Sequence, residues 1–216
     1  TQSTDKIPAP DMTPTPDKTI ATDQRLYLTV KTLAGTGKKG KKNGSAFIAE
    51  FSFPEDVSID SSGTVYVADR DNHLIRKIAG GVVTTLCGSG FPGYKDGPAL
   101  KADLNRPRGI AVGTSGEVYF SEEGNNTVRV FKNGTVKTVA GTGKKGSSDG
   151  PALKASFSKP VGMWVSNVSD LYIVDSDNNK IRRLSKGLVQ TIAGTGVAGS
   201  KDGAALSSTF HYPKDI

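Results

Sequence analysis

The sequence predicts an all-β protein built from small repeated sheets, and three observations lead to this class. A pattern of 53 residues recurs along the chain and is marked by its prolines, Pro54, Pro107, Pro160 and Pro213. Short apolar runs between these prolines are separated by glycine turns, and the 216 residues include 26 glycines. Hydrophobic residues make up 35% of the chain. This composition fits a sheet protein with many turns better than a helical core.

Each period contains four short apolar runs that we interpret as strands. The runs lie at 56–60, 64–67, 74–78 and 83–86, at 109–113, 117–120, 128–131 and 136–139, and at 162–166, 170–174, 181–184 and 189–192. Glycine turns such as Asn133-Gly134 separate them, and short strands joined by tight turns form antiparallel hairpins. Four strands in each repeat are typical of one blade of a β-propeller.

A glycine-rich loop connects one predicted blade to the next. The stretch AGTGKKG at 34–40 looks like a phosphate-binding loop, but it returns at 87–93, 140–146 and 193–199. Asp96, Asp149 and Asp202 follow in Asp-Gly pairs, and Asn43-Gly44 replaces the pair in the first copy. A dinucleotide site needs a strand, this loop and a long helix in one βαβ unit, and no such helix follows here. We therefore predict a structural loop and no cofactor.

The stretch Tyr66–Ile78, YVADRDNHLIRKI, resembles the consensus of the NHL repeat. Tyr119–Arg129 and Tyr172–Arg182 follow the same pattern without the histidine and leucine. The resemblance covers residues 26–216 and implies an NHL-type β-propeller, which commonly has six blades. It implies little about function, because NHL propellers serve many ends.

The sequence contains about three complete four-stranded blades, at 54–86, 107–139 and 160–192, with partial blades at both ends. A lone outer strand is expected at 26–33, and a lone first strand begins at Pro213. Three blades do not close a ring. We expect that the chain is part of a six-bladed ring, and that a longer chain or another subunit supplies the remaining blades. Residues 1–25, rich in Thr and Pro, read as an extended linker, with an O-glycosylated stalk as the alternative.

Three kinds of side chain recur, each at its own fixed position in every blade, and we interpret all of them as structural. They are the acids Asp69, Glu122 and Asp175, the asparagines Asn72, Asn125 and Asn178, and the arginines Arg76, Arg129 and Arg182. An acid seven residues before an arginine, across a hairpin, predicts an ion pair between neighbouring strands. An asparagine that binds its own turn backbone accounts for the repeated asparagines. The alternative is a ring of charged ligands around the propeller axis.

Lysines gather in two of the glycine loops and form a candidate docking patch. They are Lys38, Lys39, Lys41 and Lys42 in the first loop and Lys144 and Lys145 in the third. The chain has a net charge of +7, which permits contact with an anionic partner but selects none. The NHL propellers of tripartite-motif proteins bind RNA through such a basic face. Only Phe91 and Tyr94 could stack on bases here, so nucleic acid is possible but not favoured.

Sequons for N-glycosylation point to an extracellular or cell-surface setting. Asn43, Asn133 and Asn167 are candidate acceptors, whereas Asn125 occupies a structural repeat position. The sequence contains no run of 18 apolar residues, the length that would predict a membrane-spanning helix. Cys87, the single cysteine, excludes an internal disulfide and is expected to be a small buried residue. Trp164 stands where the other blades have small residues, and we expect its ring to fill a gap.

The leading interpretation is a non-catalytic protein- or glycan-binding propeller that acts as a scaffold. Lactonase-type and amidating-lyase propellers resemble this chain and hold a metal on the axis. We expect no metal site here, because His73 and His211 are the two histidines and they form no cluster in the sequence. An enzyme completed by further blades and an intracellular RNA-binding propeller remain the alternatives.

Overall fold

The computed structural model describes residues 29–216, so the linker expected at 1–25 lies outside the described residues. The chain divides into two units, Thr1–Lys31 and Thr32–Ile216. All strands and helices of the described residues belong to the second unit. Of the lone strand expected at 26–33, residues 29–33 are described, and they form no strand.

Three antiparallel sheets follow one another along the chain, and each matches one predicted blade. The first sheet contains β1 (Gly44–Ser45), β5 (Val82–Cys87), β4 (Leu74–Ala79), β3 (Val65–Asp69) and β2 (Pro54–Ile59), in that spatial order. The second contains β6 (Gly97–Pro98), β10 (Thr135–Ala140), β9 (Thr127–Lys132), β8 (Val118–Glu122) and β7 (Pro107–Val112). The third contains β11 (Gly150–Pro151), β15 (Leu188–Ala193), β14 (Lys180–Ser185), β13 (Leu171–Asp175) and β12 (Pro160–Val165).

Each sheet therefore has the four expected strands and a fifth, two-residue strand on its outer edge. In the first sheet Gly44 pairs with Val83, and the second and third sheets repeat this pairing. Five 3₁₀ turns complete the described structure: η1 (Ala46–Ile48), η2 (Arg70–Asn72), η3 (Ala99–Lys101), η4 (Ser176–Asn178) and η5 (Ala205–Ser207). The short outer strands bring the Asn-Gly and Asp-Gly pairs against the sheets.

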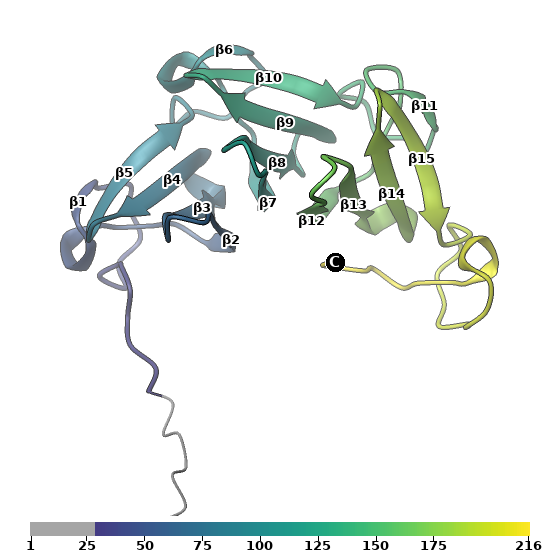
Figure 1. Ribbon diagram of the computed structural model, residues 1–216, viewed down its shortest axis with the longest axis horizontal. Coiled ribbons are helices and arrows are strands. Elements are labelled where there is room, and N and C mark those ends of the chain that lie inside the picture. The colour runs from purple at the N-terminus through teal and green to yellow at the C-terminus, as the bar shows by residue number, and fades with distance from the viewer. Residues whose placement is uncertain (1–28) are drawn as a thin grey trace, which may run out of the picture. The chain divides into compact units, whose positions relative to one another are not determined.

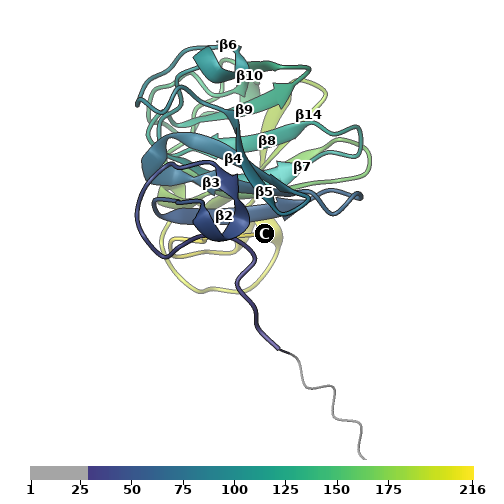
Figure 2. The same cartoon turned by 90° about the vertical axis from the view of Figure 1, so that its left-hand side faces the viewer.

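The three sheets stand side by side in an arc, with β2, β7 and β12 on the inside and β5, β10 and β15 on the outside (Figure 1). Figure 2 shows the same row from the end of the first sheet. The C-terminal segment returns to the inner strands, where the Gly162 amide donates a 3.0 Å hydrogen bond to the Lys214 carbonyl. The segment that begins at Pro213 therefore lies beside β12, as the expected first strand would, but its residues are not assigned as a strand.

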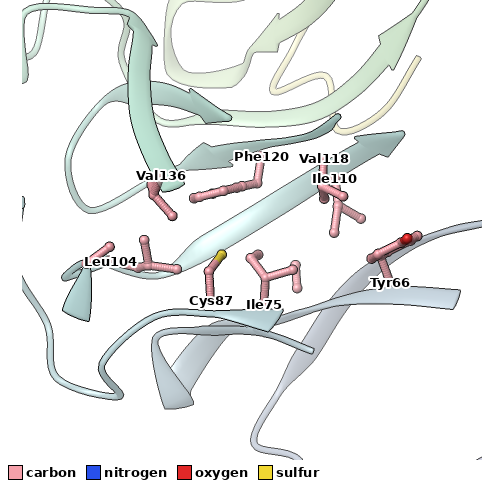
Figure 3. Packing of buried hydrophobic residues seen from close by; sticks show 10 residues of the cluster. Tyr66, Ile75, Cys87, Leu104, Ile110, Val118, Phe120 and Val136 are labelled. Atoms are coloured by element: carbon pink, nitrogen blue, oxygen red, sulfur yellow. The ribbon is translucent and has the colours of Figure 1, made fainter. Parts of the chain in front are cut away.

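The hydrophobic core lies between neighbouring sheets. Between the first two sheets, Ile75 and Cys87 on one side face Ile110 and Phe120 on the other (Figure 3). Ala111, Phe157 and Met163 belong to a second cluster between the second and third sheets. Cys87 is a buried small residue, as expected, and burial raises the pKa of its thiol. Face-to-face burial of apolar side chains is the main force that holds the blades together.

The two end faces of the row expose positions that are buried inside it. Val57 is 57% exposed, whereas its repeat equivalents Ile110 and Met163 are 3% and 5% exposed. At the other end Trp164 is 52% exposed and its ring lies 5.5 Å from that of Tyr172. Trp164 therefore lies on an end face, and residues 29–216 do not form the gap that its ring is expected to fill. Within residues 29–216 no further sheet covers either face.

Candidate docking face

A buried arginine holds each blade together. Arg76, Arg129 and Arg182 are fully buried, and each donates to the carboxylate of the acid seven residues earlier. The nitrogen–oxygen distances are 2.7 Å to Asp69, 2.9 Å to Glu122 and 2.6 Å to Asp175. The ion pairs expected across neighbouring strands are thus present.

The same arginine also fixes the glycine loop that precedes its blade. Arg182 donates to the Ser148 and Ser156 carbonyls at 2.9 and 3.1 Å and to Asp149 at 2.7 Å, and its guanidinium lies 5.1 Å from the Phe157 ring centroid. Arg76 and Arg129 make corresponding contacts with Asn43 and Asp96. The Asp-Gly and Asn-Gly pairs are therefore parts of an arginine clamp, a function that the turn motif alone did not reveal.

The repeated asparagines also bind this loop and not their own turns, so the expected turn interaction is wrong. The side-chain amides of Asn72, Asn125 and Asn178 donate to the carbonyls of Gly40, Gly93 and Gly146 at 2.6, 2.9 and 2.7 Å. Each amide also donates to the clamp carboxylate of its blade. The partner carbonyl lies 32 residues earlier, which explains why local turn chemistry could not identify it.

Burial and hydrogen bonding act in opposite directions on the clamp carboxyls. Burial, the largest effect, raises the pKa of Asp69, Glu122 and Asp175, while bonds from the asparagine, the arginine and a backbone amide act to lower it. A buried carboxylate with several donors is structurally satisfied. These residues therefore hold the fold, and they do not form a ring of ligands around the axis.

A second contact, which the sequence did not suggest, links one blade to the next. The residue after each repeated asparagine is in a left-handed conformation, with φ of +57° at His73, +52° at Asn126 and +51° at Asn179. His73 Nδ1 accepts a hydrogen bond from the Arg106 amide at 3.1 Å. Asn126 and Asn179 accept from the Lys159 and Tyr212 amides, each at 2.9 Å. His73, Asn126 and Asn179 therefore each act as a clasp to the next segment of the row.

The glycine loops are not phosphate cradles, because their amides are already bonded within the chain. In the third loop the amides of Gly141, Thr142 and Gly146 donate to the carbonyls of Ala152, Ala155 and Phe157. The other loops repeat this pattern. A β-carbon at Gly141 would lie 2.7 Å from the Asn126 carbonyl, so the glycine allows the loop to rest on the preceding blade.

The six lysines of the candidate docking patch are exposed on these loops. Lys39 Nζ lies 4.5 Å from the Phe53 ring centroid, and Lys41 Nζ lies 5.4 Å from that of Phe91 in the next loop. Lys145 lies 3.5 Å from Asp177 in the turn between β13 and β14. Because the loops adjoin these turns, the lysines and the turns share one face, which we call the loop face.

Two exposed aromatic rings lie between the lysine-bearing loops. Phe91 is 68% exposed and contacts Lys41, and Tyr94 is 50% exposed and lies against Gly143, next to Lys144. The two aromatic residues noted in the sequence are therefore brought together with the basic residues. The second loop therefore places two exposed aromatic rings between the lysine clusters of the first and third loops.

Charged side chains also surround the inner end of this face between the first two blades. Three arginines and three acids form an alternating network that is absent from the third blade. Its members are Glu55, Arg70, Asp71, Arg106, Glu123 and Arg108. A hollow of about 250 Å³ lies beside it and is lined by both carboxylates and cations, including Asp56, Arg108 and Asp215. The mixed charges contrast with the basic outer loops.

No group of three or more His, Cys, Asp or Glu side chains within residues 29–216 is arranged to hold a metal ion. His73 serves the clasp, and the ring of His211 lies 5.1 Å from that of Tyr212. In the same part of the chain, no helix is long and apolar enough to cross a membrane.

Comparison with known proteins agrees with the repeat pattern. The NHL repeat family model matches residues 51–78 and 104–131. Protein SUPPRESSOR OF QUENCHING 1, chloroplastic, from Arabidopsis thaliana is 29% identical over 209 residues, which are 87% of this chain and 20% of that protein. NHL repeat-containing protein 2 from Bos taurus is 25% identical over 220 residues, which are 84% of this chain and 30% of that protein. The chain thus spans less than a third of these relatives.

A solved gluconolactonase from Xanthomonas campestris has a similar fold, with a TM-score of 0.50 and 13% sequence identity. The similarity covers 66% of this chain and 48% of the gluconolactonase. At this level of identity the likeness shows only a common architecture of repeated antiparallel sheets.

Proposed function

Because the chain is an NHL-repeat protein whose three sheets are blades of a β-propeller, we propose that it is a non-catalytic binding module. It holds an anionic protein or glycan against the loop face. The basic patch supports this proposal: its lysines are exposed on one face, whereas the repeated acids and arginines are buried in structural clamps. A surface that gathers positive charges attracts a negatively charged partner.

Binding to heparin, a sulfated glycan, and to poly-glutamate tests the proposal. The patch variant combines Lys38→Ala, Lys39→Ala and Lys144→Ala, three exposed residues of the loops. The matched control combines Lys101→Ala, Lys137→Ala and Lys154→Ala, which remove the same charge from exposed positions outside the patch. We expect the patch variant to bind at least about tenfold more weakly, and to show a shallower salt dependence than the control. Equal losses in the two variants would show that only net charge matters.

RNA is the second candidate partner, and the exposed rings of Phe91 and Tyr94 between the lysine-bearing loops favour it. Stacking of a base on an aromatic ring contributes about 1–3 kcal/mol. If single-stranded RNA is the partner, Phe91→Ala will weaken its binding by about tenfold and leave heparin binding unchanged. Equal effects on both ligands would reject base stacking.

Catalysis is the other class of function, and we propose that the chain has none. Lactone hydrolysis and bound metal, measured on protein from its natural source, test this. Activity that a chelator abolishes and added metal restores would overturn the proposal.

We further propose that the protein is extracellular or on the cell surface, and that its blades are part of a six-bladed ring. The exposed end faces, where Val57 and Trp164 occupy positions of the blade interfaces, support a ring completed by a longer chain or another subunit. The intact mass of the natural protein, with and without glycosidase, tests both ideas. A mass of 22.6 kDa would require another subunit to complete the ring. Recovery only from the cytosol would contradict the proposed location.

A further inference from the structure

The structure separates the four sequons into two that are part of the fold and two that are accessible. Asn43 Oδ1 accepts a 2.7 Å hydrogen bond from Arg76 in the clamp. Asn125 is 9% exposed and donates to both Gly93 and Glu122. These two asparagines occupy positions where every repeat needs an asparagine or an aspartate. Their sequons therefore follow from the fold.

Asn133 and Asn167 differ, because both are exposed and neither side chain is bonded to another of the residues 29–216. Asn133 lies in the two-residue turn between β9 and β10, with φ of +49°. Asn167 lies in the turn between β12 and β13, where the other blades have Ser61 and Thr114. The repeat does not require an asparagine at either position.

The hydroxyl residue of each accessible sequon also departs from the repeat. Ser169 has φ of +65°, at a position where the other two blades have glycine, Gly63 and Gly116, with φ of +81° and +83°. A serine in this conformation is strained relative to glycine. Thr135 replaces the apolar residues Val82 and Leu188. At both positions the other repeats show which residue suits the fold better. A hydroxyl residue there indicates a requirement that does not come from the fold.

Both sites lie at the ends of the blades opposite the loop face. Turns that join the first to the second strand and the third to the fourth strand share one edge of an antiparallel sheet. In the third blade, an open hollow of about 680 Å³ is bordered by Val168 and Ser169 of one turn and Lys186 of the other. A bulky group on this side would leave the lysines accessible.

We propose that Asn133 and Asn167 are acceptors for N-linked glycans, donated by a lipid-linked oligosaccharide diphosphate. The side-chain amide nitrogen forms a bond to the anomeric carbon of the sugar, the lipid diphosphate leaves, and the amide loses one proton. Natural use of these sites rests on the proposed extracellular location. The capacity to be modified does not, and it is tested separately.

The test expresses the complete chain behind a signal peptide in a secreting eukaryotic host. Occupied sites are mapped by mass spectrometry after glycosidase release in heavy-oxygen water. We expect glycans at Asn133 and Asn167 and none at Asn43 or Asn125. Absence from the first pair, or equal occupancy of all four, would overturn the proposal.

Two variants remove a sequon while restoring the repeat, so that loss of folding cannot explain the result. Ser169→Gly will abolish modification at Asn167 and raise the melting temperature of the deglycosylated chain. Thr135→Val will abolish modification at Asn133, whereas Thr135→Ser will retain it. A glycan that persists at Asn167 in the Ser169→Gly chain would show that the sequon is not what directs modification.

Discussion

Arg129 illustrates how one side chain organises a blade. It pairs with buried Glu122, binds the Lys95 carbonyl and Asp96, and lies 5.3 Å from the Tyr94 ring centroid. Its replacement by methionine keeps an unbranched apolar stem but leaves the carboxylate without its cation. A buried charge that loses its partner destabilises a protein by about 3–5 kcal/mol.

We therefore expect Arg129→Met to lower the free energy of unfolding by about 3–5 kcal/mol, as measured by urea denaturation. Lys137→Met, on the exposed side of β10, is the control and should change the free energy by less than about 0.5 kcal/mol. Similar small changes in both variants would show that the clamp contributes little.

The clasp of His73 gives the chain a predictable pH dependence. Burial, the largest effect, lowers the pKa of His73 below 6.5, and Nδ1 must be unprotonated to accept from the Arg106 amide. The unfolded chain then binds a proton more readily than the folded chain does. The contribution of the clasp is thus fully present above pH 6.5 and declines as the pH falls through 6.5 towards the folded-state pKa.

His73→Asn tests this interpretation, because the other blades have asparagine in the same role. Urea midpoints measured between pH 5 and pH 8 should decline less steeply for the variant as the pH falls. An identical profile for both chains would mean that another group causes the dependence.

At the scale of the element, the glycine loops pass close to the backbone of the blade that they leave. Gly141 has φ of +99°, and a β-carbon there would meet the Asn126 carbonyl at 2.7 Å. Gly35, at the same repeat position, has φ of +109°, and among residues 29–216 its β-carbon would meet the Phe51 side chain, at 3.5 Å. Both positions disfavour alanine by about 1–2 kcal/mol through their backbone conformation. Gly141 adds a collision with the backbone of the blade that its loop leaves, and no residue of 29–216 makes such a contact at Gly35.

We expect Gly141→Ala to lower the thermal midpoint clearly more than Gly35→Ala does. Differential scanning calorimetry of both variants measures the difference, which isolates the backbone contact at Gly141 from the conformational effect. If the two midpoints fall equally, the close approach at Gly141 is relieved by a small shift of the loop.

Repeat spacing and local pattern predict the strands and the clamp pairs, because both depend on residues that are near in sequence. The pairing of Asp69 with Arg76 needs only the register of one hairpin. The bond from Asn72 to the Gly40 carbonyl spans 32 residues, and β1 has two residues that become a strand only beside β5. The exposure of Trp164 depends on which neighbour covers its blade. These features follow from tertiary placement, which a local pattern does not contain.

For the whole molecule, Cys87 reports how the first two blades separate. The thiol is fully buried in the cluster between them, and burial raises its pKa, so it is both inaccessible and protonated in the folded chain. We expect a thiol reagent to label it only after the blades open, at a rate that increases with urea. Rapid labelling of the native chain would show that this interface opens without global unfolding.

The arginine clamp also defines the unit by which such a protein can grow. Arg182 binds residues 148, 149 and 156 of its preceding loop, and Arg129 binds residues 95 and 96 of its own. The repeat unit that contains a complete clamp therefore begins at the glycine loop, and not at the proline that marks the first strand. A genetic crossover just before Ala140 would transmit a blade together with everything that fastens its arginine. A crossover just before Pro160 would leave the arginine in one descendant and its loop in another.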